Sequence, residues 1–114
     1  MGPKTKLPHT ETYALNRERF HRGMSLYDVQ FVMGSEPTTG SGPRGEYFLA
    51  RSKEYREILN SNSDIVILYH DEPEVGYAPF VWFKFVWELA SGGRYRSVVD
   101  FGLGEATRGI IYDL

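Results

Sequence analysis

The clearest pattern of apolar and polar residues lies in the second half of the chain and predicts β-structure. Residues 65–69 form an almost wholly apolar run rich in β-branched side chains, which predicts a strand with both faces covered. In residues 80–89 the odd positions are all apolar and the even ones are mixed, so the odd side chains face the core. After a turn at residues 91–93, residues 95–101 complete a hairpin, and residues 108–112 supply a last strand.

One helix in the first half has clear signals at both ends. Ser25 is an N-cap residue with Asp28 three positions on, a variant of the capping box, and Gly34 follows the last turn. Between these ends, apolar side chains recur at the spacing that makes one helical face. They are Leu26, Val29, Val32 and Met33.

Two shorter helices are predicted on either side of it. Asn16 caps a helix through about His21, which Gly23 ends, and Ser52 caps a helix through Asn60. Both carry a few apolar side chains on one face.

The remaining segments of the first half predict loops and one short strand. Residues 35–45 are rich in Gly, Pro and Ser, which predicts a flexible loop that cannot hold a helix or a central strand. Residues 46–50 predict a short strand. Residues 1–11 contain two prolines and show no periodicity, so they predict a flexible lead-in to a single domain over residues 12–114.

The order of these elements predicts the fold class. Helices come first and antiparallel strands follow, which is typical of α+β proteins. We expect an N-terminal helix pair packed on an antiparallel β-meander of three to five strands, with one extra short helix. At 114 residues the chain can bury roughly 65% of its unfolded surface, enough for one core without covalent links.

Composition excludes several classes of function. The chain has no cysteine, which excludes disulfides, thiolate zinc sites, iron–sulfur clusters and a cysteine nucleophile. A net charge of -2 and a pI near 5.9 argue against nucleic acid as a ligand. No apolar run approaches the roughly 20 residues of a transmembrane helix. No signal peptide or lipidation cysteine is visible in the chain as given, although a chain starting after a removed signal would look the same.

Two glycine clusters resemble phosphate-binding loops but lack their defining residues. The cluster at residues 40–45 has no Gly-Lys-Ser/Thr ending, so a plain loop is expected. In the cluster of Gly102, Gly104 and Gly109, Thr107 stands where a dinucleotide fingerprint needs glycine. A β-turn is therefore expected at Gly102 and Gly104.

No residues predict catalysis, a metal site or a cofactor. His70 with Asp71, Glu72 and Glu74 can be drawn as a hard-metal or acid–base cluster, but no second ligand group is evident elsewhere. Acidic residues in a Pro/Gly loop after a strand are more often a solvated turn. The serines fall in caps, turns or an ordinary strand, without a nucleophile elbow.

Aromatic content points instead to protein binding. Seven Phe, eight Tyr and two Trp make up 15% of the chain, more than one small core readily holds. The even-numbered face of residues 80–89 is half apolar, which is typical of a protein-binding surface. We expect this surface to contain Tyr47, Phe80, Trp82 and Lys84. The alternative is that the helices cover this face.

One segment resembles a known family. Residues 20–37 resemble the opening of the SmpA/OmlA (BamE-like) family of small outer-membrane lipoproteins, in which a short helix leads to Gly-Met-Ser/Thr, a capped helix and a glycine–proline exit. The matching residues are Gly23, Met24, Ser25, Val29, Gly34 and Pro37. Residues 98–102 and 109–112 resemble the family's closing strand, turn and strand.

This resemblance implies a function without catalysis. It implies a periplasmic scaffold that docks onto outer-membrane assembly proteins, through an architecture similar to that of β-lactamase inhibitor proteins. The chain as given leaves a cytoplasmic location as the alternative. A second hypothesis is an inhibitor or immunity-type protein that blocks a toxin or enzyme with the acidic loop 71–74. A third is a small-ligand or enzyme domain with a pocket at His70. An open edge at residues 108–112 could also form a homodimer.

Overall fold

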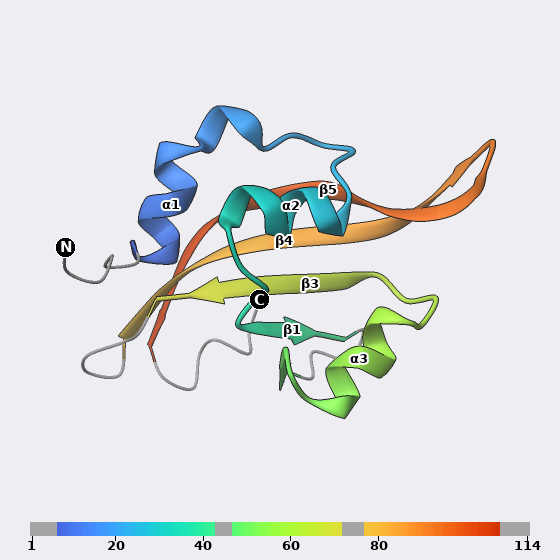
Figure 1. Ribbon diagram of the computed structural model, residues 1–114. Helices are drawn as coiled ribbons and strands as arrows, with labels where there is room; N and C mark the ends of the chain where they lie inside the picture. The colour runs from blue at the N-terminus through green and yellow to red at the C-terminus, as the bar shows by residue number, and fades with distance from the viewer. Residues whose placement is uncertain (1–6, 43–46, 72–76, 108–114) are drawn as a thin grey trace, which may run out of the picture.

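The computed structural model describes residues 7–42, 47–71 and 77–107, and it confirms the α+β class (Figure 1). Helices precede most of the strands, and they pack together on one antiparallel sheet. The elements are α1 (His9–Leu15), a 3-10 turn (Arg17–Arg19), α2 (Leu26–Met33), β1 (Thr39–Ser41), β2 (Tyr47–Leu49), α3 (Lys53–Leu59), β3 (Ile65–His70), β4 (Tyr77–Ala90) and β5 (Gly93–Thr107).

The five strands lie in the order β2-β1-β3-β4-β5, and every neighbouring pair is antiparallel. The expectation of a loop over residues 35–45 is wrong for β1, which lies between β2 and β3. The physical reason is at Gly40, where a Cβ atom would come within 1.9 Å of Cε1 of Tyr55. The glycine lets the Tyr55 ring from α3 pack directly against the strand backbone.

The hairpin of β4 and β5 is the longest feature of the sheet and extends beyond the helices (Figure 1). Its tight turn ends at Gly93, whose φ of 123° favours glycine. The expected turn at Gly102 and Gly104 is wrong, because both lie inside β5 and pair with β4. The last strand expected at residues 108–112 lies outside the described residues.

The main core lies between the three helices and one face of the sheet, here called the inner face. The odd positions of β4 that lie under the helices, Val81, Phe83 and Phe85, are fully buried as the alternation predicted. Trp87 is only half-buried and Leu89 is 83% exposed, because the hairpin projects past the helices there. The helices add Tyr13, Phe20, Val29, Met33 and Tyr55 to this core.

The first helix differs in position from the prediction. The α-helix covers residues 9–15 and starts after Pro8, so its first turn lies in the segment expected as lead-in. Within the predicted range of residues 16–21 the chain forms only a 3-10 turn over Arg17–Arg19, with Asn16 at its N-cap. Proline is common at helix starts because the first N–H groups of a helix have no intrahelical partner, so the lack of an N–H in proline costs no hydrogen bond there. The side chain of Asp71, after β3, accepts hydrogen bonds from the amide and hydroxyl of Thr10 and so attaches this turn to the sheet.

The second helix confirms the prediction at both ends. Ser25 and Asp28 form a reciprocal capping box, with Asp28 N donating to Ser25 Oγ at 3.0 Å. Gly34 ends the helix in the left-handed conformation at φ 77°. Before the helix, the N–H of Gly23 donates to the carbonyl of Val98 on β5 at 2.9 Å. The motif segment is therefore attached to the sheet.

The third helix also begins where predicted, with Ser52 accepting a hydrogen bond from the amide of Tyr55. Its C-terminal end is held by Arg96 of β5, which is only 8% exposed. The guanidinium donates to four carbonyl oxygens at 2.7–3.3 Å, which belong to Ile58, Leu59, Ser61 and Ser63. A cation there satisfies carbonyls that a helix end leaves without intrahelical partners.

Candidate interaction surface

The strand register aligns side chains in rows across the outer face of the sheet, opposite the helices. One row passes through Trp82 at its centre and another through Lys84. In order from β2 to β5, the Trp82 row contains Leu49, Thr39, Leu68, Trp82 and Gly102. The next row contains Tyr47, Ser41, Val66, Lys84 and Asp100.

All four residues predicted from the sequence lie on this outer face. Tyr47, Phe80 and Trp82 pack around Leu68 in a small second core to which, among the described residues, no helix contributes. Lys84 lies two residues along β4 from Trp82 and therefore on the same face. The alternation of residues 80–84 therefore predicts the side of the sheet correctly for Phe80, Trp82 and Lys84.

Two glycines of β5 make room for the two large rings of β4. Gly104 pairs with Phe80, and a Cβ at Gly104 would come within 2.4 Å of the Phe80 ring. Gly102 pairs with Trp82, and a Cβ there would lie 3.4 Å from the indole. Each ring thus lies across a glycine of the neighbouring strand, an arrangement that compensates for the weak packing of strand glycines.

Burial separates the four residues into different roles. Phe80 is 1% exposed, so its ring is a packing residue and not part of the accessible surface; this corrects its expected role. Tyr47 and Trp82 are half-buried, and Lys84 is exposed. Leu49, which the sequence pattern did not identify, is 67% exposed in the Trp82 row. A three-residue strand is too short for alternation to reveal such a position.

Two oppositely charged side chains of this face lie on neighbouring strands. Lys84 and Asp100 are both exposed and lie opposite one another on β4 and β5. The side chain of His70 also lies on this face, and its ring and that of Phe80 form a T-shaped pair with 5.6 Å between centroids. Burial lowers the pKa of His70, the nearby His9 lowers it further, and Asp71 opposes these effects. His70 is therefore neutral at pH 7 and adds no charge.

Of the cluster that can be drawn around His70, only His70 and Asp71 lie among the described residues. Asp71 is bonded to Thr10, whereas Glu72 and Glu74 lie outside the described residues. Among residues 7–42, 47–71 and 77–107, no three His, Asp or Glu side chains are placed to share a metal ion. Within the same residues, no helix is both long and apolar enough to cross a membrane.

Comparisons with protein-family models, curated proteins and solved structures found no match to this chain. The assignment of a function therefore depends on the outer face itself and on the motif residues.

Proposed function

We propose that this chain is a non-catalytic protein-binding module whose partner docks on the outer face of the sheet around Trp82. The observation that carries the proposal is the asymmetry of the sheet. All three helices pack on the inner face, whereas the outer face presents a half-buried Trp82 together with the exposed Lys84 beside it and the exposed Leu49 in the same row. A partly accessible tryptophan on a fixed backbone is a typical anchor for a protein partner.

The rigid support of Trp82 favours recognition. The indole lies over Gly102 on one side and packs against the Leu68–Phe80 cluster beneath it, so few rotamers are open to it before binding. An anchor that is already ordered loses less conformational entropy when a partner covers it. The opposite charges of Lys84 and Asp100 beside it supply a polar rim that selects the partner's orientation.

The resemblance to the SmpA/OmlA family supports the same function class. Its motif residues have defined structural roles here: Gly23 adopts a positive φ, Ser25 caps α2, Val29 is buried and Gly34 ends the helix. On this basis we propose an envelope location and an outer-membrane assembly protein as the partner. The inhibitor alternative depends on the loop 71–74, most of which lies outside the described residues.

An affinity capture with point variants tests the proposal. The immobilised chain is exposed to extract from the source cells, and retained proteins are compared between wild type, Trp82→Ala, Lys84→Glu and the matched control Lys53→Glu on exposed α3. We expect one protein retained by wild type and by Lys53→Glu, and at least tenfold depleted with Trp82→Ala, since hot-spot truncations cost about 2 kcal/mol or more. Equal retention of the same proteins by all four chains would exclude the outer face as the partner-binding surface.

A further inference from the structure

The outward side of α2 carries two exposed aromatic rings that the proposed partner surface does not use. Tyr27 is 74% exposed and Phe31 is 68% exposed, whereas Val29 and Met33 on the other side of the helix are buried. Tyr27 and Phe31 are four residues apart, so their side chains are neighbours on the helix surface. They line a hollow of about 340 Å³ with Gln30, Gly34, Ser35 and Glu36.

Three features of this hollow favour a cation. Aromatic faces carry negative potential, and α2 ends at Gly34, so the carbonyls of its last turn also present negative potential there. The Glu36 carboxylate is exposed and has no hydrogen bond or ion pair among the described residues. No lysine or arginine among these residues lines the hollow. The residues that line this first hollow therefore favour positive charge.

The segment that forms the floor of the hollow is fixed before any ligand binds. Gly34 holds the left-handed conformation, Pro37 is buried, and the Tyr69 hydroxyl donates to the carbonyl of Ser35 at 2.8 Å. These constraints hold the backbone on which Glu36 is carried. A preorganised backbone loses little entropy on binding, which favours even a small ligand.

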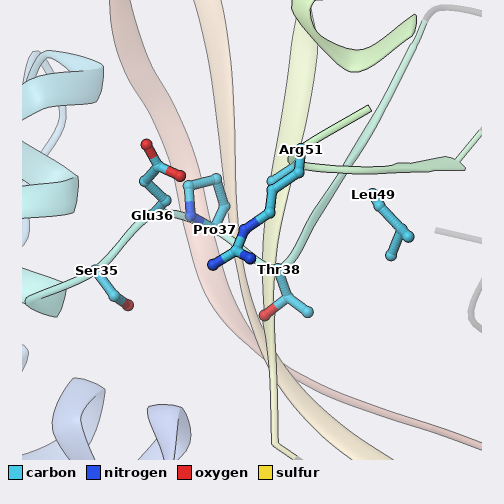
Figure 2. Close-up of a pocket in the computed structure, with 7 residues that line it drawn as sticks. Ser35, Glu36, Pro37, Thr38, Leu49 and Arg51 are labelled. Carbon is cyan, nitrogen blue, oxygen red and sulfur yellow. The ribbon is translucent and has the colours of Figure 1, made fainter. Parts of the chain in front are cut away.

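A second hollow continues from the first on the far side of Glu36. It has a volume of about 510 Å³, shares Ser35 and Glu36 with the first, and extends to Leu49 and Arg51 (Figure 2). In the view of Figure 2 the Arg51 side chain extends toward Pro37, with Glu36 beyond it. Arg51 is exposed and has no ion-pair partner among the described residues, so this hollow favours a carboxylate.

We infer that these two hollows together bind an extended peptide, with an arginine side chain between Tyr27, Phe31 and Glu36 and a carboxylate against Arg51. Two adjoining hollows of opposite charge preference fit a chain with both charges better than a single small ion. Arginine suits the first hollow because its planar guanidinium stacks on aromatic rings and pairs with a carboxylate in two hydrogen bonds. The first hollow lies beside α2 on the helix side of the molecule, and the second reaches Leu49 at the edge of the outer face, about three strands from Trp82.

A titration followed by amide-correlation NMR of the nitrogen-15-labelled full chain tests this inference. The probe is the peptide acetyl-Ala-Arg-Ala-Glu-amide, for which we expect Kd in the low millimolar range. The changes in amide chemical shift should be concentrated at residues 27–36 and 49–51. The same peptide with Gln in place of Arg should bind at least about fivefold more weakly, because it loses the cation–π and ionic contacts. The same peptide with Lys in place of Arg should bind with an affinity between those of the Arg and Gln peptides.

Variants of the chain identify the residues responsible. Glu36→Gln should raise the Kd for the arginine peptide by roughly threefold to tenfold, and the double variant Tyr27→Ala/Phe31→Ala should raise it by a similar factor. The matched control Glu54→Gln, an exposed carboxylate on α3, and the outer-face variant Trp82→Ala should leave Kd unchanged. The inference is overturned if no shifts appear up to about 10 mM peptide, if the Gln peptide binds equally, or if Glu36→Gln binds as wild type.

Discussion

Replacing Arg96 by methionine should destabilise the protein more than any other change of a charged residue that the structure describes. The substitution keeps most of the side-chain volume but removes five hydrogen bonds to four carbonyl oxygens of residues 58–63, the shortest at 2.7 and 2.9 Å. It also removes the contact of the guanidinium with the Trp87 ring, 4.3 Å from the centroid. Arg96 thus connects the hairpin to the end of α3.

The expected magnitude follows from these contacts. Hydrogen bonds to a charged group contribute about 1.5–3 kcal/mol each when buried, and the two short ones account for about 3 kcal/mol. The ring contact adds about 0.5–1 kcal/mol, whereas release of the buried guanidinium offsets part of the loss. We expect the free energy of unfolding to fall by about 3 kcal/mol, and Tm to fall by roughly 10–20 °C for a domain of this size.

Urea unfolding followed by circular dichroism measures this difference, and Arg94→Met is the matched control. Arg94 also lies over Trp87, at 4.7 Å from the centroid, but it is exposed and bonds only Asn62 among the described residues. The control should lose less than about 1 kcal/mol. Arg96→Lys should recover only a minor part of the loss, because an ammonium cannot reach four acceptors in this geometry. If Arg96→Met and Arg94→Met were equally stable, the reasoning would be refuted.

Three further predictions concern packing, capping and pH. Gly40→Ala should cost about 2–3 kcal/mol because its Cβ would overlap the Tyr55 ring, whereas Gly92→Ala, with open space around it, should be nearly neutral in the same urea assay. Ser25→Ala should lower the free energy of unfolding by about 1 kcal/mol, because it removes the cap of α2. A loss of less than about 0.3 kcal/mol would contradict the capping role. The pKa of His70 is lowered in the folded state, so the unfolded chain binds the proton first and stability is lost as the pH falls below about 6.5. Urea midpoints between about pH 7.5 and about pH 5.5 should show this fall, and His70→Gln should reduce it.

The sequence was sufficient to predict elements whose boundaries and faces are determined by residues within the element itself. The helix after Ser25 was predicted from its capping residues and Gly34, and each of these interactions forms within the segment itself. The strand alternation of residues 80–85 likewise identified the inner and outer faces correctly, because a side-chain period of two needs no knowledge of the partner strands.

The structural roles of three glycines could not be predicted from the sequence, because they depend on aromatic rings that are distant along the chain. Gly40, Gly102 and Gly104 have the local signature of loops and turns, but all three are strand residues against which aromatic side chains pack. The Tyr55 ring that explains Gly40 is fifteen residues away in the sequence, and the Phe80 ring that explains Gly104 is on another strand. The spacing of Phe80 and Trp82 matches that of the two glycines of β5, and this matched spacing is the signal that could have identified the pairing.

The candidate surface was predicted in its location but not in its composition. The pattern identified the face of Trp82 and Lys84, yet it could not show that Phe80 is buried by its neighbours or that Leu49 remains exposed. Burial on an open sheet face depends on which side chains of three different strands meet in one row. That information arises only from the register of the assembled sheet.

Site-specific photo-crosslinking in the source cells tests the central claim most directly. A photoreactive phenylalanine analogue replaces Lys84 on the outer face in one chain and Lys53 on α3 in another, both at exposed positions. The account predicts a discrete crosslinked partner from position 84, lost when Trp82→Ala is added, and none from position 53. A crosslink from position 53 alone, or one from position 84 that survives Trp82→Ala unchanged, would contradict the outer face as the partner surface.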